Sequence, residues 1–498
     1  MRESDMRDHD LFEERRREFT ALVEIEHDEK DKENDGWVTF DCFSRNQPWG
    51  YARLENEFDL LALRASFTSV ARLFPGIGES EGRWVKIDIA SQKTVNSISA
   101  EVVMFGDNSE PVSLHIVSVS PVELSEWENG IFMLAGEVRS PASFIAGVLD
   151  VALRRSGTFA IATYDVGQGN CNAIVDKYEH PRVFFDLGWA PNFHAHTRPP
   201  FQPDFFSCDH HTVAPVVLSH WDMDHWSYAI AKSKYDPANL TTKHEWNEEA
   251  LKRFWIARAP EIEQHQIGPL ARSFYNALAN EYLLPGISAM LLWPDNCKRI
   301  RFSDGWLEAC EPATHLTRDR NNTGIAMFVR PKGKGSAILM TGDADFPSIP
   351  SLVTNQRLKL AGMVAPHHGS RITSAAVPKP MPGSPKKLVL SVGKGNSYGH
   401  PKQDSIDAYV AAGWDWTVVL TQDRHACNRT YSPYAVGHKH NHGNILLKFS
   451  INAKDPQCSC GSVQEGNLCL IPSDVPVSTP LAAVKKTRRR KVKRVTII

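Results

Sequence analysis

Four side chains of the kind that bind metal ions lie within six residues of this chain. His220, Asp222, Asp224 and His225 follow the apolar residues 216–218, which predict a short strand. A loop that begins where a strand ends can turn such side chains toward one point, and imidazole and carboxylate groups bind zinc, manganese or iron. Two histidines and two aspartates suggest a pair of ions that share ligands, which is typical of phosphate-ester hydrolysis. The alternative is an ordinary solvated loop.

The same design occurs twice more downstream. Residues 337–341 are an apolar run followed by Gly342-Asp343, and residues 360–366 are another run followed by His367-His368. Alone, a Gly-Asp pair is usually a turn and a His-His pair is usually a surface feature. Because an α/β fold collects side chains at the ends of neighbouring strands, three such segments predict one metal site along a sheet edge.

These ordered segments resemble the metal-binding motifs of the metallo-β-lactamase fold. More narrowly, the chain resembles the soluble hydrolase domain of ComEC-type DNA-uptake proteins. Three further segments carry that resemblance: 164–170 (Tyr-Asp-Val-Gly-Gln-Gly-Asn), 184–188 (Phe-Phe-Asp-Leu-Gly) and 391–401 (Ser-Val-Gly-Lys-Gly-Asn-Ser-Tyr-Gly-His-Pro). The resemblance covers about residues 158–450, and it implies an α/β hydrolase domain built as a four-layer αββα sandwich.

The resemblance also implies six metal ligands for two divalent ions, either Zn²⁺ or Mn²⁺. The expected arrangement is His220 and Asp222 on the first ion, Asp224 and His225 on the second, Asp343 bridging both, and His367 completing the second site. We expect His367 there because it follows the predicted strand directly, and His368 is the alternative. Three aspartates make a hard site, so manganese is a credible occupant beside zinc.

Further roles follow from the same resemblance. Asp186 would orient the motif loop by hydrogen bonding. Asp224 or Asp343 would steer the attacking hydroxide, and His368 or His400 would protonate the departing oxygen or bind phosphate. These five positions make up the expected reaction machinery around the ions.

The chain departs from the family pattern at three places. Asp222 stands where the zinc β-lactamases have histidine, although the carboxylate form is familiar in the ComEC-like branch. Asn170 replaces the usual aspartate of the Gly-Gln-Gly-Asp turn. His315 lies in the interval of the separate mid-chain histidine of many relatives, but most lone histidines are not ligands.

The expected activity is metal-dependent hydrolysis. Two ions lower the pKa of a shared water, so that a metal-bound hydroxide attacks phosphorus while the ions neutralise charge on the phosphate oxygens. We therefore predict a phosphodiesterase or nuclease that acts on DNA or RNA through a dinuclear centre. Two alternatives stay open: a small-molecule phosphoesterase for a nucleotide or phosphocholine-type ester, and a non-catalytic partner-binding protein.

Composition divides the chain into four expected parts. Residues 1–36 are a charged N-terminal arm, 37–155 an accessory α+β domain, 156–455 the hydrolase domain, and 456–498 a Cys-containing, basic tail. Within them we expect strands at 84–89, 113–119, 416–421 and 444–449, helices at 143–153 and 403–412, and inserted helices in 232–290.

Charge and cysteine content limit the partners and the cellular compartment that we expect. The formal net charge of the 498 residues is −2, and the basic run 485–494 contributes +8, so the remainder carries −10. A basic arm on an acidic body is typical of nucleic-acid contact, and the N-terminal region is a candidate surface for a protein partner. No apolar run is long enough to cross a membrane, and nine scattered cysteines indicate reduced thiols, so we expect a cytoplasmic protein without a membrane partner. A structural zinc site is an alternative reading of the His- and Cys-rich residues 425–469.

Overall fold

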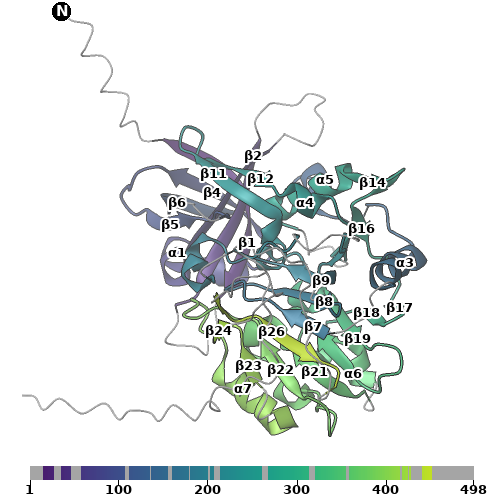
Figure 1. The fold of residues 1–498 in the computed structure, drawn as a ribbon. Coiled ribbons are helices and arrows are strands. Elements are labelled where there is room, and N and C mark those ends of the chain that lie inside the picture. The colour runs from purple at the N-terminus through teal and green to yellow at the C-terminus, as the bar shows by residue number, and fades with distance from the viewer. Residues whose placement is uncertain are drawn as a thin grey trace, which may run out of the picture.

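The structure, a computed structural model, is a mixed α/β fold rich in strands. It describes residues 15–26, 35–45, 58–106, 111–134, 136–154, 160–178, 180–199, 202–206, 213–260, 267–312, 320–354, 358–414, 418–423, 425–427 and 440–450. Over these residues the strands form three large sheets and two small two-stranded ones. The small sheets pair β14 (Tyr282–Leu284) with β15 (Ile287–Ser288), and β24 (His425–Cys427) with β25 (His440–His442). Figure 1 shows the N-terminal strands at one end of the molecule and the C-terminal strands at the other.

The first large sheet is antiparallel and has eight strands in the order β11-β12-β3-β2-β1-β4-β6-β5. Strand β5 also pairs with β3, which closes six of the strands into a ring. We call this sheet the N-terminal barrel. Apolar side chains from the ring, among them Val23, Phe40 and Leu63, fill its interior. Its strands are β1 (Arg16–Glu26), β2 (Trp37–Arg45), β3 (Phe58–Ser66), β4 (Trp84–Ala90), β5 (Ile98–Val102), β6 (Ser113–Pro121), β11 (Ile230–Asp236) and β12 (Thr241–Trp246).

Two seven-stranded sheets make up most of the remaining chain. The first has the order β16-β13-β10-β9-β8-β7-β26, and the second runs from β17 to β23 in sequence order. Strands β9, β10, β13 and β16 are parallel to one another, as are β20 to β23. The first comprises β7 (Ala160–Thr163), β8 (Cys171–Val175), β9 (Pro181–Leu187), β10 (Val216–Val217), β13 (Trp255–Ala257), β16 (Met290–Leu292) and β26 (Ile445–Lys448). The second comprises β17 (Arg299–Phe302), β18 (Gly305–Ala309), β19 (Ile325–Val329), β20 (Ala337–Met340), β21 (Leu360–Val364), β22 (Lys387–Leu390) and β23 (Val418–Leu420).

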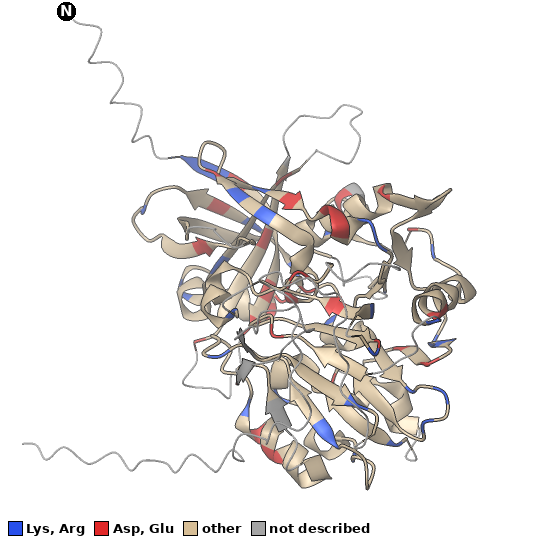
Figure 2. Ribbon diagram, in the orientation of Figure 1, with Lys and Arg blue, Asp and Glu red and all other residues tan. Residues whose placement is uncertain are grey.

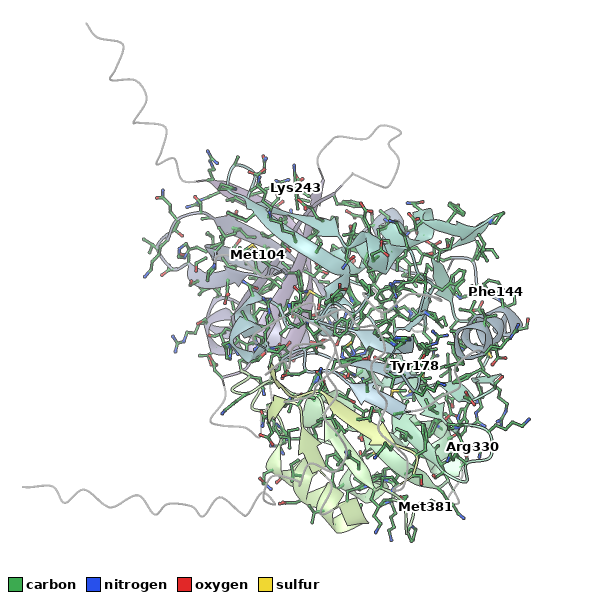
Figure 3. All side chains as sticks on the ribbon, viewed as in Figure 1. Met104, Phe144, Tyr178, Lys243, Arg330 and Met381 are labelled. Atoms are coloured by element: carbon green, nitrogen blue, oxygen red, sulfur yellow. The ribbon has the colours of Figure 1, made fainter. Side chains whose placement is uncertain are left out.

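The two seven-stranded sheets share one buried core. Phe185 and Ile256 of the first sheet belong to the same apolar cluster as Met327 and Ile338 of the second. The opposite face of the first sheet packs against α5, and the opposite face of the second packs against α7. Side chains fill the spaces between these layers (Figure 3). We call the two sheets together the sheet pair.

Seven short helices complete the described elements. They are α1 (Phe67–Leu73), α2 (Glu126–Phe132), α3 (Ala142–Leu153), α4 (Glu248–Leu251), α5 (Pro269–Asn280), α6 (Pro350–Thr354) and α7 (Gln403–Tyr409). The predicted helices at 143–153 and 403–412 are confirmed by α3 and α7, and the predicted strands by β4, β6, β23 and β26. Within the described ranges, no helix has the length and apolar character that a membrane crossing requires.

Two predictions of local structure are wrong. Residues 16–26, expected within a charged arm, form β1, which pairs with β2 on one side and β4 on the other. Residues 232–290 are not mainly helical, since β11 and β12 form a hairpin whose polar residues alternate as in a half-exposed strand. Because this hairpin joins the N-terminal barrel through β3, the barrel takes strands from both sides of the boundary expected at residue 155.

Candidate metal centre

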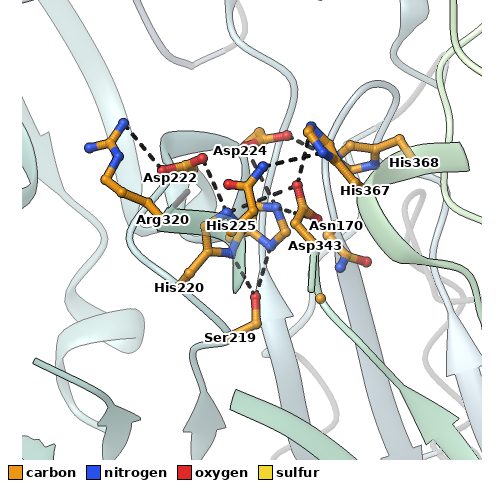
Figure 4. Close-up of polar contacts among 12 residues, drawn as sticks. Asn170, Ser219, His220, Asp222, Asp224, His225, Arg320, Asp343, His367 and His368 are labelled. Carbon is orange, nitrogen blue, oxygen red and sulfur yellow. Dashed lines mark hydrogen bonds and ion pairs between the residues drawn. The ribbon is translucent and has the colours of Figure 1, made fainter. Parts of the chain in front are cut away.

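The expected ligands follow the carboxyl ends of neighbouring parallel strands. The loop with His220 and His225 follows β10, which is parallel to β9, and Asp186 lies at the end of β9. In the second sheet, Asp343 follows β20, and the histidine pair 367–368 follows its parallel neighbour β21. Parallel neighbours end at the same edge of a sheet, so the chain brings these side chains together. Figure 4 shows them converging.

Glycines allow the motif loops to approach closely. A Cβ at Gly188 would lie 1.8 Å from the carbonyl oxygen of Asp224, which is incompatible with any side chain. Gly342 has a φ of 58°, and a Cβ there would lie 2.4 Å from the Cβ of Ser219. The first sheet's motif loop and the Gly-Asp turn of the second sheet are therefore in direct contact.

One group of ligand atoms comes from His220, His225 and Asp343, within 4.8 Å of one another. The Nε2 atom of His225 lies 3.1 Å from Asp343 Oδ1, and that of His220 lies 3.9 Å from Asp343 Oδ2. Asp222 borders this group, with its Oδ2 atom 3.1 Å from His220 Nε2. All three members are buried, whereas the Asp222 side chain is 27% exposed.

A second group contains Asp224, His225 and His368 and shares His225 with the first. His368 Nε2 lies 3.0 Å from Asp224 Oδ2, and its Nδ1 donates to the carbonyl of Ser391 at 2.6 Å, which leaves Nε2 as the coordinating nitrogen. His367 lies apart from this group: its side chain is 38% exposed, with Nε2 3.6 Å from Asp343 Oδ2. The geometry favours His368 for the position that we expected His367 to fill.

Buried polar atoms without partners show that these residues fit a metal ion. Among the described residues, Nε2 of His220, Nε2 of His225 and Oδ1 of Asp343 are buried and lie within ion-pair distance of a neighbouring ligand group, but none of them forms a hydrogen bond of good geometry. Burying such atoms unsatisfied costs about 1–3 kcal/mol each, so an arrangement that points three of them at one another requires compensation. A divalent cation provides it, and nitrogen and carboxylate ligands suit zinc or manganese.

The protonation equilibria of the site show how strongly its charges are coupled. Burial alone would raise the pKa of Asp343, but His225 and His367 hold that pKa well below its usual value. Burial alone would lower the pKa of His225, but Asp343 and Asp186 hold that pKa well above its usual value. A positive charge between these carboxylates is therefore stabilised, and either a proton or a metal ion can supply it.

Asp186 orients the motif loop, as the resemblance implies. Its Oδ1 accepts a hydrogen bond from the backbone N–H of Ser219 at 2.7 Å, and its Oδ2 accepts one from Nδ1 of His225 at 2.9 Å. The latter bond fixes the histidine tautomer and turns Nε2 toward Asp343. Asp186 has a φ of 63°, a conformation that is sparsely populated for a residue with a side chain.

The departure at Asn170 has a structural explanation. Its Nδ2 donates to Oδ2 of Asp186 at 3.1 Å, and its Oδ1 accepts from Nδ2 of Asn172 at 2.7 Å. Both carboxamides are buried, so the amide of Asn170 satisfies the Asp186 carboxylate without adding charge. An aspartate at position 170 would place two carboxylates side by side.

The sequence interpretation missed two charged residues beside the metal centre. Arg320 begins the short 3₁₀ turn Arg320–Thr323, and its Nη2 lies 2.6 Å from Oε1 of Glu24 and 3.7 Å from Oδ1 of Asp222. Although burial disfavours its charge, Glu24 and Asp222 hold the pKa of Arg320 above its usual value. Glu24 belongs to β1, so the N-terminal barrel reaches the site. Figure 2 shows acidic residues in the middle of the molecule, where these parts meet. No local motif marked this pair, because its members lie 296 residues apart.

Of the remaining expected positions, His400 lies near the candidate centre and the others lie outside the described residues. The ring of His400 lies 5.5 Å from that of His367, and its buried Nδ1 forms no hydrogen bond among the described residues. His400 therefore borders the centre without joining either ligand group. His315, residues 428–439 and the basic run 485–494 lie outside the described residues, as do the cysteines of the expected tail.

A small cleft opens beside His220 and Asp222. Its lining includes Trp221 and Arg320, together with an apolar side from residues 259, 260 and 267. Trp226, in contrast, is fully buried and stacks on Phe274 with ring centroids 4.7 Å apart, so it belongs to the core.

Comparison with known proteins does not identify a family for this chain. No model of a protein family matches the chain, and no curated protein is similar to it.

Proposed function

We propose that this chain is a metal-dependent hydrolase of the metallo-β-lactamase fold that cleaves phosphodiesters in DNA or RNA. The observation that carries the proposal is the set of three orphaned ligand atoms on His220, His225 and Asp343. They lie at the carboxyl ends of strands in two sheets that share one core, the position that the αββα sandwich gives to its metals. The ordered motifs support the narrower likeness to the ComEC-type hydrolase domain.

The proposed ligand set differs from the sequence expectation in one histidine. One ion would be held by His220, Asp222 and Asp343, and the other by Asp224, His225, His368 and the bridging Asp343. When bound, the two ions would lower the pKa of a water and neutralise charge on the phosphate oxygens.

The chain's own residues would perform the remaining steps. Asp224 is 25% exposed and placed to accept a proton from the attacking water. His367 is the most exposed histidine of the centre, and its ring is held near Asp343 by a 3.2 Å contact between Nδ1 and the amide nitrogen of Asn321. It is the proposed donor to the leaving oxygen, the role that we expected of His368 or His400.

A small-molecule phosphodiester is the second candidate substrate. The cleft beside His220 is small, which suits a small ester better than a duplex. This observation also suits a single-stranded end or a flexible loop of nucleic acid. Partner binding without catalysis is disfavoured, because every ligand of the proposed centre is present.

The test is hydrolysis of labelled single-stranded DNA, double-stranded DNA, RNA and bis(p-nitrophenyl) phosphate, with and without added manganese or zinc. We expect turnover that disappears on thorough chelation and returns with either metal. Preference for a polymer over the small ester would support the nuclease assignment, and the reverse would support the second candidate. Activity that survives both chelation and the Asp224→Ala substitution would contradict the mechanism.

A further inference from the structure

Arg320 lies where a substrate phosphate beside the metal centre would need a positive charge. It lines the cleft together with His220 and Asp222, and its side chain is 15% exposed. A guanidinium offers five N–H donors in a planar fork that matches phosphate oxygens. The position of Arg320 therefore places an anion-binding group next to a proposed metal ligand.

Only part of this guanidinium is engaged by protein. Both contacts, to Glu24 and to Asp222, are made by Nη2. Within the described ranges, no hydrogen bond or ion pair is made by Nε or Nη1 of Arg320, and Figure 4 shows the rest of the guanidinium turned away from Asp222. These donors are available to a ligand in the cleft.

The other arginine of the cleft is already occupied. Arg258 Nη1 donates to the carbonyls of Cys310 and Gly324, at 2.7 and 3.2 Å, and so ties the cleft wall together. The indole N–H of Trp221 donates to the carbonyl of Arg258 at 2.7 Å, which fixes the aromatic side of the cleft. Arg258 is therefore a structural residue, held by carbonyl groups of the cleft wall, whereas the printed contacts of Arg320 are to two carboxylates.

Glu24 explains how Arg320 can serve the site without disabling a metal ligand. An arginine beside an aspartate would normally form a bidentate pair with it and compete with a cation for the carboxylate. Here Glu24 is the nearer partner, at 2.6 Å against 3.7 Å for Asp222. The carboxylate from β1 draws the guanidinium aside, which leaves Asp222 free to face His220.

We propose that Arg320 is the phosphate-binding residue of this cleft and that Glu24, supplied by the N-terminal barrel, is its positioning residue. The inference rests on the proposed hydrolase function and deepens it. The substrate class is an anionic phosphoester, with the phosphate between Arg320 and the metal centre and a flat or apolar group against Trp221. The barrel would then be part of the substrate site.

The first test compares two substrates with the same leaving group in the metal-loaded full-length protein. Bis(p-nitrophenyl) phosphate carries a negative charge, whereas p-nitrophenyl acetate is neutral. Arg320→Ala should raise KM for the phosphate ester about 10- to 100-fold, the loss expected for a charge-assisted contact, and leave acetate hydrolysis within about 3-fold. Arg320→Lys should recover part of the loss, because it keeps the charge but not the fork. Glu24→Gln should raise KM less than Arg320→Ala does.

The second test is binding of inorganic phosphate by calorimetry, which does not depend on turnover. Wild type should bind phosphate, and Arg320→Ala should weaken that affinity at least 10-fold while the bound metal stays the same. Arg301→Ala is the matched control, since Arg301 is an exposed arginine of β17 that does not line the cleft. Equal phosphate affinity in Arg320→Ala and Arg301→Ala, or no phosphate binding by wild type, would overturn the inference.

The two proposals can fail separately. Metal-dependent hydrolysis with unchanged KM in Arg320→Ala would overturn the role of Arg320 and leave the hydrolase intact. Phosphate binding that depends on Arg320, in a protein that hydrolyses none of the esters, would support the anion site and contradict the enzyme. Melting temperatures of all variants show whether a lost function reflects unfolding.

Discussion

The sheet pair and the N-terminal barrel contribute to the same site in different ways. The sheet pair supplies every proposed metal ligand from strand ends, through segments that are contiguous in sequence. The barrel supplies Glu24, near the end of β1, whose partner Arg320 belongs to a loop of the sheet pair. Ligands near one another in sequence can be recognised from a motif, whereas a contact between distant segments needs the fold. The comparison separates residues that bind the ions from residues that shape access to them.

The largest expected effect is on the sheet pair's bridging carboxylate. Asp343→Asn removes one negative charge from the carboxylate that is proposed to serve both ions, so we expect loss of bound metal and a fall in hydrolysis of about 1000-fold or more. Metal analysis and steady-state kinetics measure the two effects. Asp295→Asn is the matched control, since Asp295 is exposed and makes only a surface ion pair with Arg139. Equal metal content in the two variants would break the assignment of ligands to strand ends.

A core substitution in the barrel tests whether that region holds the ions. Phe40 is fully buried in the barrel interior, so Phe40→Ala should lower the free energy of unfolding by about 3–5 kcal/mol. Because no proposed ligand comes from the barrel, the folded variant should keep its metal at low temperature. Val95→Ala, at a position that is 89% exposed, should change stability by about 0.5 kcal/mol or less. Denaturant unfolding measures the stability of both variants, and metal analysis measures their metal content. Loss of metal from folded Phe40→Ala would contradict the proposal that the sheet pair alone holds the ions.

A smaller effect is expected at Asn170, where the chain departs from the pattern of the family that it resembles. Asn170→Asp would place a second buried carboxylate 3.1 Å from that of Asp186, and we expect a loss of about 1–3 kcal/mol in the free energy of unfolding. The comparison variant is Asn172→Asp, which keeps the added charge but sits one hydrogen bond further from Asp186. Thermal unfolding near neutral pH measures both. An Asn170→Asp protein as stable as wild type would show that the amide is not needed there.

The smallest effect concerns His244 on the hairpin β11–β12 of the barrel. Burial lowers the pKa of His244 from 6.5 to about 4. The unfolded chain therefore binds more protons than the folded chain between these pH values, and stability falls as the pH drops through this window. His244→Gln should flatten the decline, with a gain relative to wild type of about 1–2 kcal/mol near pH 4. Urea unfolding at pH 7 and pH 4.5 tests this, and parallel declines in both proteins would contradict it.

The elements of the sheet pair were largely predictable, whereas in the barrel β4 and β6 were predicted and β1, β11 and β12 were not. Strand ends at 216–217, 337–340 and 360–364 could be located because buried parallel strands are short apolar runs that stop at polar ligands. Strand β1 was not predicted because charged residues, such as Arg17 and Glu18, are frequent both in the strand and in the residues around it. Its interior face, with Phe19 and Val23 at alternating positions, was the signal that could have identified it.

The site shows the same limit at the level of single residues. Motifs placed His220, His225 and Asp343 together, but they could not decide between His367 and His368. The choice depends on the left-handed conformation of both residues, with φ values of 47° and 53°, and on the Ser391 carbonyl that holds the His368 ring. Arg320 and Glu24 carried no motif, since neither has a partner nearby in sequence.

The central claim is that the strand ends of the sheet pair hold two metal ions, with His225 as a ligand of one of them. The most direct measurement is the metal content of purified wild type and His225→Ala by mass spectrometry, with His244→Gln as the control. We predict two ions per chain in wild type and in the control, and fewer than two in His225→Ala. Equal metal content in wild type and His225→Ala would contradict the account.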